Sequence, residues 1–231
     1  MLLIRLVKKE IKLGNAFDLI VVLSLISILP LLAVICTSFL KISVVLLFLR
    51  ESLALQQNPP NIVIYGIAII LAVYTMGPVC NNLNNSLTQI TAIRTNGSGN
   101  VSSDLLKVAG SIAEPLKIFL EKNTSKDNQK YFYDNLTRLW GNSPSGSVDK
   151  HDFLVLVPSF MLTQLNEAFK IGFLLYLPSL IIDVFISNLL LALGMMMMSP
   201  MTISTPIKLI LFITIGGWQK VIDLLLHSFS V

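Results

Sequence analysis

The stretch FLLYLPSLIIDVFISNLLLALGMMMMSPMTISTPIKLILF, residues 173–212, places a run of methionines between two apolar runs. The first apolar run, 173–193, and the block IKLILFITIGGWQKVIDLLL at 207–226 each approach the ~20 residues that a helix needs to cross a bilayer. Gly194 and the Ser199-Pro200 pair flank the methionines and favour a loop or a broken helix there. The stretch therefore predicts an apolar helical hairpin with a methionine-rich loop.

A second pair of apolar blocks lies near the start of the chain. LIVVLSLISILPLLAVICTSF covers 19–39 and IVIYGIAIILAVYTMGPV covers 62–79. The segment between them reads as a helix that stops at Pro59 and Pro60, so a helical hairpin is expected here too. With 54% hydrophobic and 13% charged residues and a mean hydropathy of +0.75, the composition predicts an all-α membrane protein. The net charge of +4 is scattered, which argues against nucleic-acid binding.

The composition changes sharply in the middle of the chain. Residues 81–152 carry eight Lys or Arg and seven Asp or Glu, with the turn cluster GNSPSGS at 141–147. These features predict a water-exposed, mainly helical insert between two apolar parts, 1–80 and 153–231. Five N-x-S/T sequons would also suit a glycoprotein, although such triplets arise by chance in Asn- and Ser-rich loops.

The apolar blocks are poor spanning helices. Asp183 and Lys208 lie within them, and five prolines are expected to interrupt them: Pro30, Pro78, Pro178, Pro200 and Pro206. Broken helices that bear charge are stable only against protein or water. We therefore expect these hairpins to pack mainly on neighbouring subunits.

The basic residues near the N-terminus do not fix the orientation in the membrane. The leader, residues 1–12, is basic and favours a cytoplasmic N-terminus, whereas Lys41 and Arg50 favour a cytoplasmic first loop. We expect Lys41 and Arg50 to snorkel toward an interface. No small-x-small cleavage site follows the first apolar run, so the leader is expected to stay in the mature protein.

Four charged residues are candidates for buried ion pairs or intersubunit contacts. Asp183 needs a partner or water, and Lys208 or Lys170 could supply the cation. Glu167 and Lys170 are three residues apart and form either an ordinary exposed helix pair or an intersubunit contact. The sequence leaves these alternatives open.

The methionine run, Met195, Met196, Met197 and Met198, is the most unusual feature of the chain. Successive helical residues turn by about 100°, so four in a row cannot form one core stripe. Methionine is flexible and polarisable, which suits a surface that must seal yet yield. Several subunits around an axis could bring these side chains into a deformable collar. A lipid-facing or core segment is the alternative.

No catalytic constellation is visible. An enzyme would need a nucleophile with its base, a carboxylate pair or a metal cluster, and none occurs at helical spacing. His151 and His227 have no second ligand nearby, and Cys36 and Cys80 lie in apolar runs, so no metal, cofactor or disulfide is expected. A broken-helix solute transporter is the competing function, because Asp183 lies within an apolar helix, although the two halves show no internal repeat.

Two long stretches resemble the SctR/FliP family of type III secretion proteins. They are LPLLAVICTSFLKISVVLLFLRESLALQQNPPN at 29–61 and EAFKIGFLLYLPSLIIDVFISNLLLALGMMMMSPMTISTPIKLILF at 167–212. Together they cover roughly half the chain, whereas the insert matches no family pattern. Flagellar relatives usually carry a cleaved signal that this N-terminus lacks, so the injectisome branch is favoured.

The resemblance implies a virulence-associated export protein of the bacterial inner membrane. Several copies would assemble with SctS-like and SctT-like proteins, and with SctU-like and SctV-like components, into a helical pore for unfolded substrates. It also implies that the methionine loop, Met195 to Met198, is the gasket of that channel. The apolar hairpins, multi-pass by hydropathy, would then be raised toward the periplasm and covered by neighbours.

Overall fold

The structure, a computed structural model, describes residues 24, 27, 30–31, 34–56, 58–77, 79, 101–140, 149–195 and 197–229. Throughout these residues the regular structure is helical, which confirms the predicted all-α fold. The helices are α3 (Phe39–Ser52), α4 (Asn61–Thr75), α6 (Val101–Lys122), α7 (Lys126–Trp140), α8 (Phe153–Ala192), α9 (Pro200–Thr214) and α10 (Gly217–His227). Most of the first apolar block, 19–39, lies outside the described residues, as do 81–100 and 141–148 of the insert.

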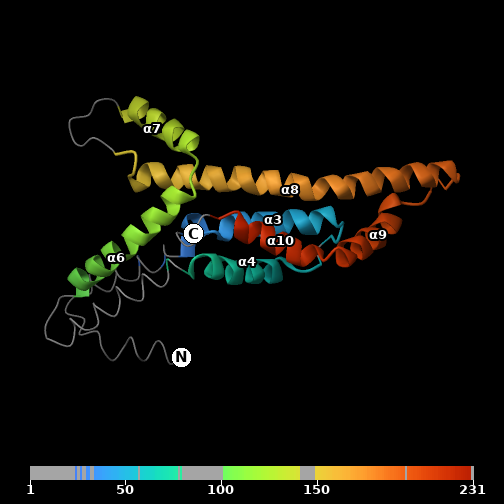
Figure 1. The fold of residues 1–231 in the computed structure, drawn as a ribbon, viewed down its shortest axis with the longest axis horizontal. Helices are drawn as coiled ribbons and strands as arrows, with labels where there is room; N and C mark the ends of the chain where they lie inside the picture. Colours follow the sequence, from blue (N-terminus) through green and yellow to red (C-terminus); the bar gives the residue numbers. More distant parts are fainter. Residues whose placement is uncertain are drawn as a thin grey trace, which may run out of the picture.

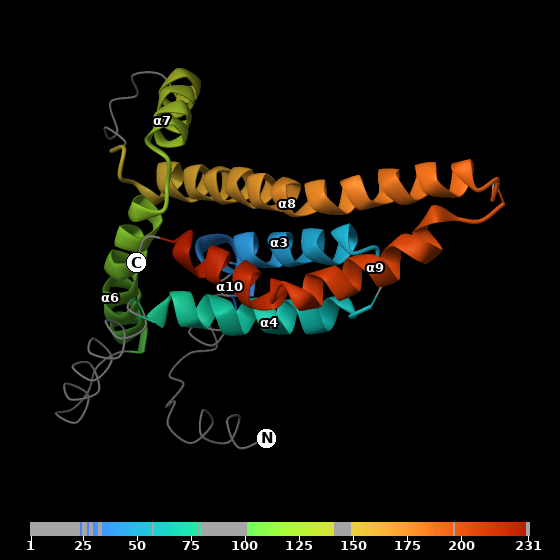
Figure 2. The same cartoon turned by 45° about the vertical axis from the view of Figure 1, so that its right-hand side comes forward.

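The long helix α8 sets the length of the molecule. Its 40 residues span about 60 Å at 1.5 Å per residue. Helix α3 packs along α8, α4 packs on α3, and α9 with α10 runs back beside α3 (Figure 1 and Figure 2). Helices α6 and α7 lie at one end of α8, and the turn into α9 lies at the other.

Helix α3 is the centre of the core. It is apolar around most of its circumference, as expected for a helix covered on several sides. Its fully buried side chains include Ile42, Val45, Leu46 and Leu49. They join one hydrophobic cluster with residues of α4, α8, α9 and α10, among them Ala68, Phe160, Phe212 and Leu225. One layer of side chains thus holds both hairpins together.

The expectation that proline interrupts the apolar blocks is wrong for Pro178 and Pro206. Helix α8 continues through Pro158 and Pro178, and α9 continues through Pro206. A proline inside a helix removes one backbone hydrogen bond and disturbs one turn. Helix α8 is held to α3 before Pro178, through Glu167, and to α9 after it, through Asp183, and these contacts offset that local loss. Pro78 lies outside the described residues.

The true break in the last apolar block falls at two glycines. Helices α9 and α10 meet at an angle of 66°. Gly216 takes the left-handed conformation with φ +66°, which is accessible to glycine at no steric cost. A Cβ on Gly217 would lie 2.3 Å from the ring of Phe212, so this close approach requires glycine.

The first hairpin is tied by an arginine. The Nη1 of Arg50, near the end of α3, donates to the carbonyl oxygen of Pro59 at 3.2 Å and to Oδ1 of Asn61 at 2.6 Å. Asn61 is the first residue of α4. Arg50 therefore fixes the turn that the prolines were predicted to make.

The polar insert is helical where the structure describes it, and it joins α8 through buried polar groups. Gln164 of α8 donates from Nε2 to the carbonyl oxygen of Asn123 at 2.8 Å. Thr163 Oγ1 accepts from Asn128 Nδ2 at 2.8 Å and from the backbone N–H of Ser125 at 3.2 Å. These bonds place the α6–α7 turn on the N-terminal half of α8.

Candidate functional site

Met195, Met197 and Met198 lie in the turn between α8 and α9. Helix α8 ends in a left-handed glycine, Gly194, with φ +74°. The N–H of Met195 reaches back to the carbonyl oxygen of Leu190 at 2.9 Å, the bond that closes a Schellman cap. Pro200 starts α9 one residue after Ser199. The loop predicted from Gly194 and Pro200 is therefore present, at the far tip of the molecule (Figure 1).

The methionine side chains of this turn are exposed. Met195 is 42% exposed, Met197 103% and Met198 46%, and Met201 in the first turn of α9 is 51% exposed. Met196 lies outside the described residues. Within this chain, then, the described methionines of the turn are not packing core, and their thioethers are free to meet another molecule.

A buried lysine joins the two helices that carry the turn. Lys208 of α9 is 3% exposed, and its Nζ lies 2.6 Å from Oδ2 of Asp183 on α8. The same Nζ donates to the carbonyl oxygen of Ser52 on α3 at 3.3 Å. Asp183 is half-exposed, at 42%. Of the two cations left open by the sequence, the one beside Asp183 is Lys208 and not Lys170.

A second buried lysine, on α3, pairs with a carboxylate nearer the start of α8. Lys41 of α3 is fully buried and pairs with Glu167 of α8. Its Nζ also donates to the carbonyl oxygen of Ser228 at 3.1 Å and lies 4.3 Å from the centre of the Phe229 ring. The expected snorkelling of Lys41 is therefore wrong, because the side chain points into the fold. The sequence missed this pair, since 126 residues separate its members.

The two pairs anchor the helix that carries the methionine turn. Glu167 and Asp183 are 16 residues apart, about 24 Å along α8, and Met195 follows 12 residues, about 18 Å, further on. Glu167 links α8 to Lys41 of α3, which also donates to Ser228. Asp183 links α8 to Lys208 of α9, which also donates to Ser52 of α3. The turn is thus held at the end of a helix fixed at two points.

Much of the apolar surface is left uncovered. Exposed large apolar residues include Ile70 and Tyr74 of α4, Phe173, Ile181 and Phe185 of α8, and Ile210 and Ile213 of α9. Helix α8 is long and apolar enough to cross a membrane, and α9 with α10 together would be long and apolar enough as one bent span. Contiguous apolar surface on this scale marks contact with lipid or with other protein chains.

Comparison with known proteins agrees with this arrangement. The family model described as "FliP family" matches residues 22–225, which include the insert as well as both hairpins and the methionine turn, so the expectation that the insert matches no family pattern is wrong. The chain belongs to the FliP family. The FliP family comprises structural components of secretion systems, so the prediction of a non-enzymatic protein is confirmed.

Relatives align along almost the whole chain. The harpin secretion protein HrcR of Erwinia amylovora is 42% identical over 209 residues, 90% of this chain and 93% of the relative. The virulence protein YscR of Salmonella typhimurium is 42% identical over 216 residues, 94% of this chain and 98% of the relative. Yop proteins translocation protein R of Yersinia pestis is 40% identical over 220 residues, 95% of this chain and 99% of the relative. These names confirm the resemblance to the injectisome branch of the FliP family.

Proposed function

We propose that this FliP-family chain is a pore-forming core subunit of a type III secretion export apparatus in the bacterial inner membrane. Several copies would surround an axis, together with SctS-like and SctT-like proteins and with SctU-like and SctV-like components. Unfolded protein substrates would pass along that axis. The observation that carries the proposal is the exposed methionine turn at the tip of α8, held by two anchored ion pairs.

The distribution of charge and apolar surface supports an assembled state. Two cations of the hairpins, Lys41 and Lys208, are turned inward and paired, whereas large apolar side chains face outward on α4, α8 and α9. A surface of this kind gains free energy when lipid or a neighbouring chain covers it. Copies that cover part of it through one repeated contact would bring the turns of neighbouring copies next to one another around the axis.

The chemistry of the turn suits a seal. Methionine thioethers pack against one another without directional bonds, and each side chain has three rotatable bonds. A ring of such side chains is a hydrophobic constriction, which excludes ions by excluding water. It can still deform around a polypeptide of variable side chains. We therefore assign Met195 to Met198 the role of a collar that closes the channel.

A broken-helix solute transporter is the second candidate. It is favoured by the bend between α9 and α10, because discontinuous helices often line solute sites. However, the half-buried carboxylate of Asp183 is already bound by Lys208. The transporter would be small and coupled to a solute, whereas the export subunit should copurify with partner proteins in a large complex.

The test is ion conductance of the purified complex in lipid bilayers, with Met195–Met198 deleted. We expect the complex to assemble with its normal composition and to leak ions, because the collar is absent while both ion pairs remain. The matched control replaces Met201 by Leu on the same tip, which leaves the run intact and should stay ion-tight. An assembled deletion variant that conducts no more than the unmodified complex would contradict the collar. Loss of assembly without a leak would point to packing core.

A further inference from the structure

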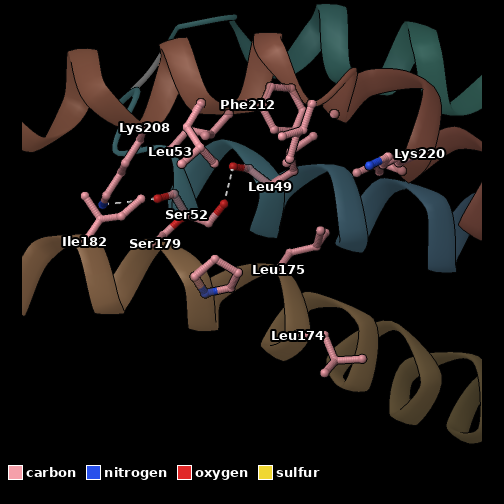
Figure 3. Close-up of a pocket in the computed structure, with 15 residues that line it drawn as sticks. Leu49, Ser52, Leu53, Leu174, Leu175, Ser179, Ile182, Lys208, Phe212 and Lys220 are labelled. Carbon is pink, nitrogen blue, oxygen red and sulfur yellow. Dashed lines mark hydrogen bonds between the residues drawn. The ribbon is translucent and has the colours of Figure 1, made fainter.

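An apolar cavity lies beside the α9–α10 bend. It has a volume of about 190 Å³, is partly open to the surface, and is lined by the end of α3, the middle of α8, and α9 with α10 (Figure 3). Its walls include Leu49 of α3, Leu53 directly after α3, Leu175 of α8, and Phe212 of α9. An apolar cavity of about 150 Å³ stays dry and can hold a benzene-sized group. This cavity therefore has room for a short hydrocarbon segment.

The cavity follows from the glycine bend and from the proline in α8. Gly217 lets the Phe212 ring fill the inner corner of the bend, so that α10 diverges from the line of α9. Pro178 and Ser179 face the space from α8 with small side chains, where a leucine would fill part of it. The void thus follows from the close approach of Phe212 to Gly217 and from the short side chains of Pro178 and Ser179 in its lining.

Two lysines lie at opposite ends of the cavity lining, with leucines between them (Figure 3). Lys208 is already neutralised by Asp183, 2.6 Å away. Lys220 of α10 is exposed, and no carboxylate in the described part of the chain forms an ion pair with it. A cation without a partner beside an apolar space matches a ligand with an anionic group and a hydrocarbon body.

The surface around the cavity is also apolar. Leu174 of α8, Leu211 of α9 and Ile215 at the bend all line the space and are exposed. A long acyl chain could leave the cavity along these side chains without meeting polar groups. Basic residues in pockets between membrane helices commonly hold lipid phosphates. A lysine stem can also lie along apolar surface while its ammonium reaches a head group.

We infer that this cavity binds one anionic phospholipid, with an acyl segment between α3, α8 and α10 and its phosphate on Lys220. The lipid would fill the space at the bend and brace α10 against α8. Free phosphate would find one solvated lysine and no reason to enter an apolar cavity. An apolar side chain of a partner would fill the cavity but leave Lys220 without an anion.

The experiment is native mass spectrometry of the full chain, purified in detergent, with added phosphatidylglycerol. Lys220→Gln should weaken retention about fivefold, the effect of removing one lysine's attraction to an anionic head group. Val221→Phe, which adds bulk to the cavity wall, should weaken it at least as much. The control Lys130→Gln removes an exposed cation from α7 and should retain lipid normally.

Further arms distinguish the alternatives. Phosphatidylethanolamine, which has no net charge, should bind more weakly than phosphatidylglycerol and respond less to Lys220→Gln. Equal retention of phosphatidylglycerol by the unmodified chain, Lys220→Gln and Val221→Phe would overturn the inference. Competition by millimolar inorganic phosphate would also overturn it, because the ligand would then be a soluble anion. This measurement needs no pore, so its result is independent of the export function.

Discussion

The Lys208 ammonium on α9 lies 2.6 Å from the Asp183 carboxylate on α8, and this pair closes the hairpin that carries the methionine turn. The two members differ in environment, since Lys208 is buried and Asp183 is half-exposed. Removal of Asp183 should therefore destabilise the fold more than removal of Lys208 does. A buried cation without a counterion is expensive, whereas a half-exposed carboxylate can be hydrated.

We expect Asp183→Ala to destabilise the fold by about 3 kcal/mol, because it leaves Lys208 buried with only the Ser52 carbonyl oxygen as a partner. Thermal unfolding in detergent and the yield of assembled complex measure this effect. The control is Asp223→Ala, which removes an exposed carboxylate from α10 and should change little. The double change Asp183→Leu with Lys208→Leu should recover much of the lost stability, since no charge remains. Normal stability of Asp183→Ala would mean that water replaces the carboxylate.

At the second pair we expect Glu167→Ala to cost more than Lys41→Met. The first change leaves the fully buried Lys41 without its carboxylate, at about 3 kcal/mol. The second replaces Lys41 by an apolar residue of similar length and loses mainly the hydrogen bond to the Ser228 carbonyl oxygen, about 1 kcal/mol. Denaturant unfolding of the two variants gives the order. The reverse order would show that the carboxylate of Glu167, and not the cation, is the group that needs its partner.

The bend between α9 and α10 gives a prediction about glycine. Gly217→Ala should destabilise by about 1 to 3 kcal/mol, because the new Cβ would meet the Phe212 ring at 2.3 Å. Gly66→Ala in the middle of α4 is the matched control. Nothing lies within 4 Å of its added Cβ, and alanine favours a helix by up to about 1 kcal/mol. Opposite signs of the two shifts in melting temperature are expected, and equal shifts would mean that Phe212 moves aside freely.

Whether a feature of the fold could be predicted from the sequence depends on how far apart in the chain the residues that produce it lie. The all-α fold, the first hairpin at Pro59 and Pro60, and the loop beside Gly194 were predicted correctly, because each depends on local chain chemistry. The expectation that Pro206 is one of the prolines that interrupt the apolar blocks was wrong. The helix tolerates that proline, whereas Gly216 and Gly217 bend it, since only there do a left-handed φ and a close aromatic ring coincide.

The ion pairs show the same limit. Asp183 was singled out because a charge in an apolar helix needs a partner, but the choice between Lys208 and Lys170 required the register of α8 against α9. Lys41 was assigned to an interface because lysines near helix ends often snorkel. Its true surroundings come from Glu167 and Ser228, more than 120 residues away in the chain. No local pattern encodes such a contact.

The last prediction separates the bulk of the methionine collar from its softness. Replacing Met195 to Met198 by leucine keeps the apolar volume nearly constant but removes the third rotatable bond and the thioether of each side chain. The closed assembly should therefore remain ion-tight, unlike the deletion variant. Passage of substrate should slow, because branched leucines adapt less readily to a polypeptide of changing side chains. Ion conductance of the reconstituted complex and the amount of secreted substrate per unit time report the two properties separately. Met201→Leu, on the same tip but outside the run, is the control and should leave both unchanged. Normal secretion by the leucine variant would mean that closure needs only apolar volume, and a leak would mean that the thioethers themselves make the seal.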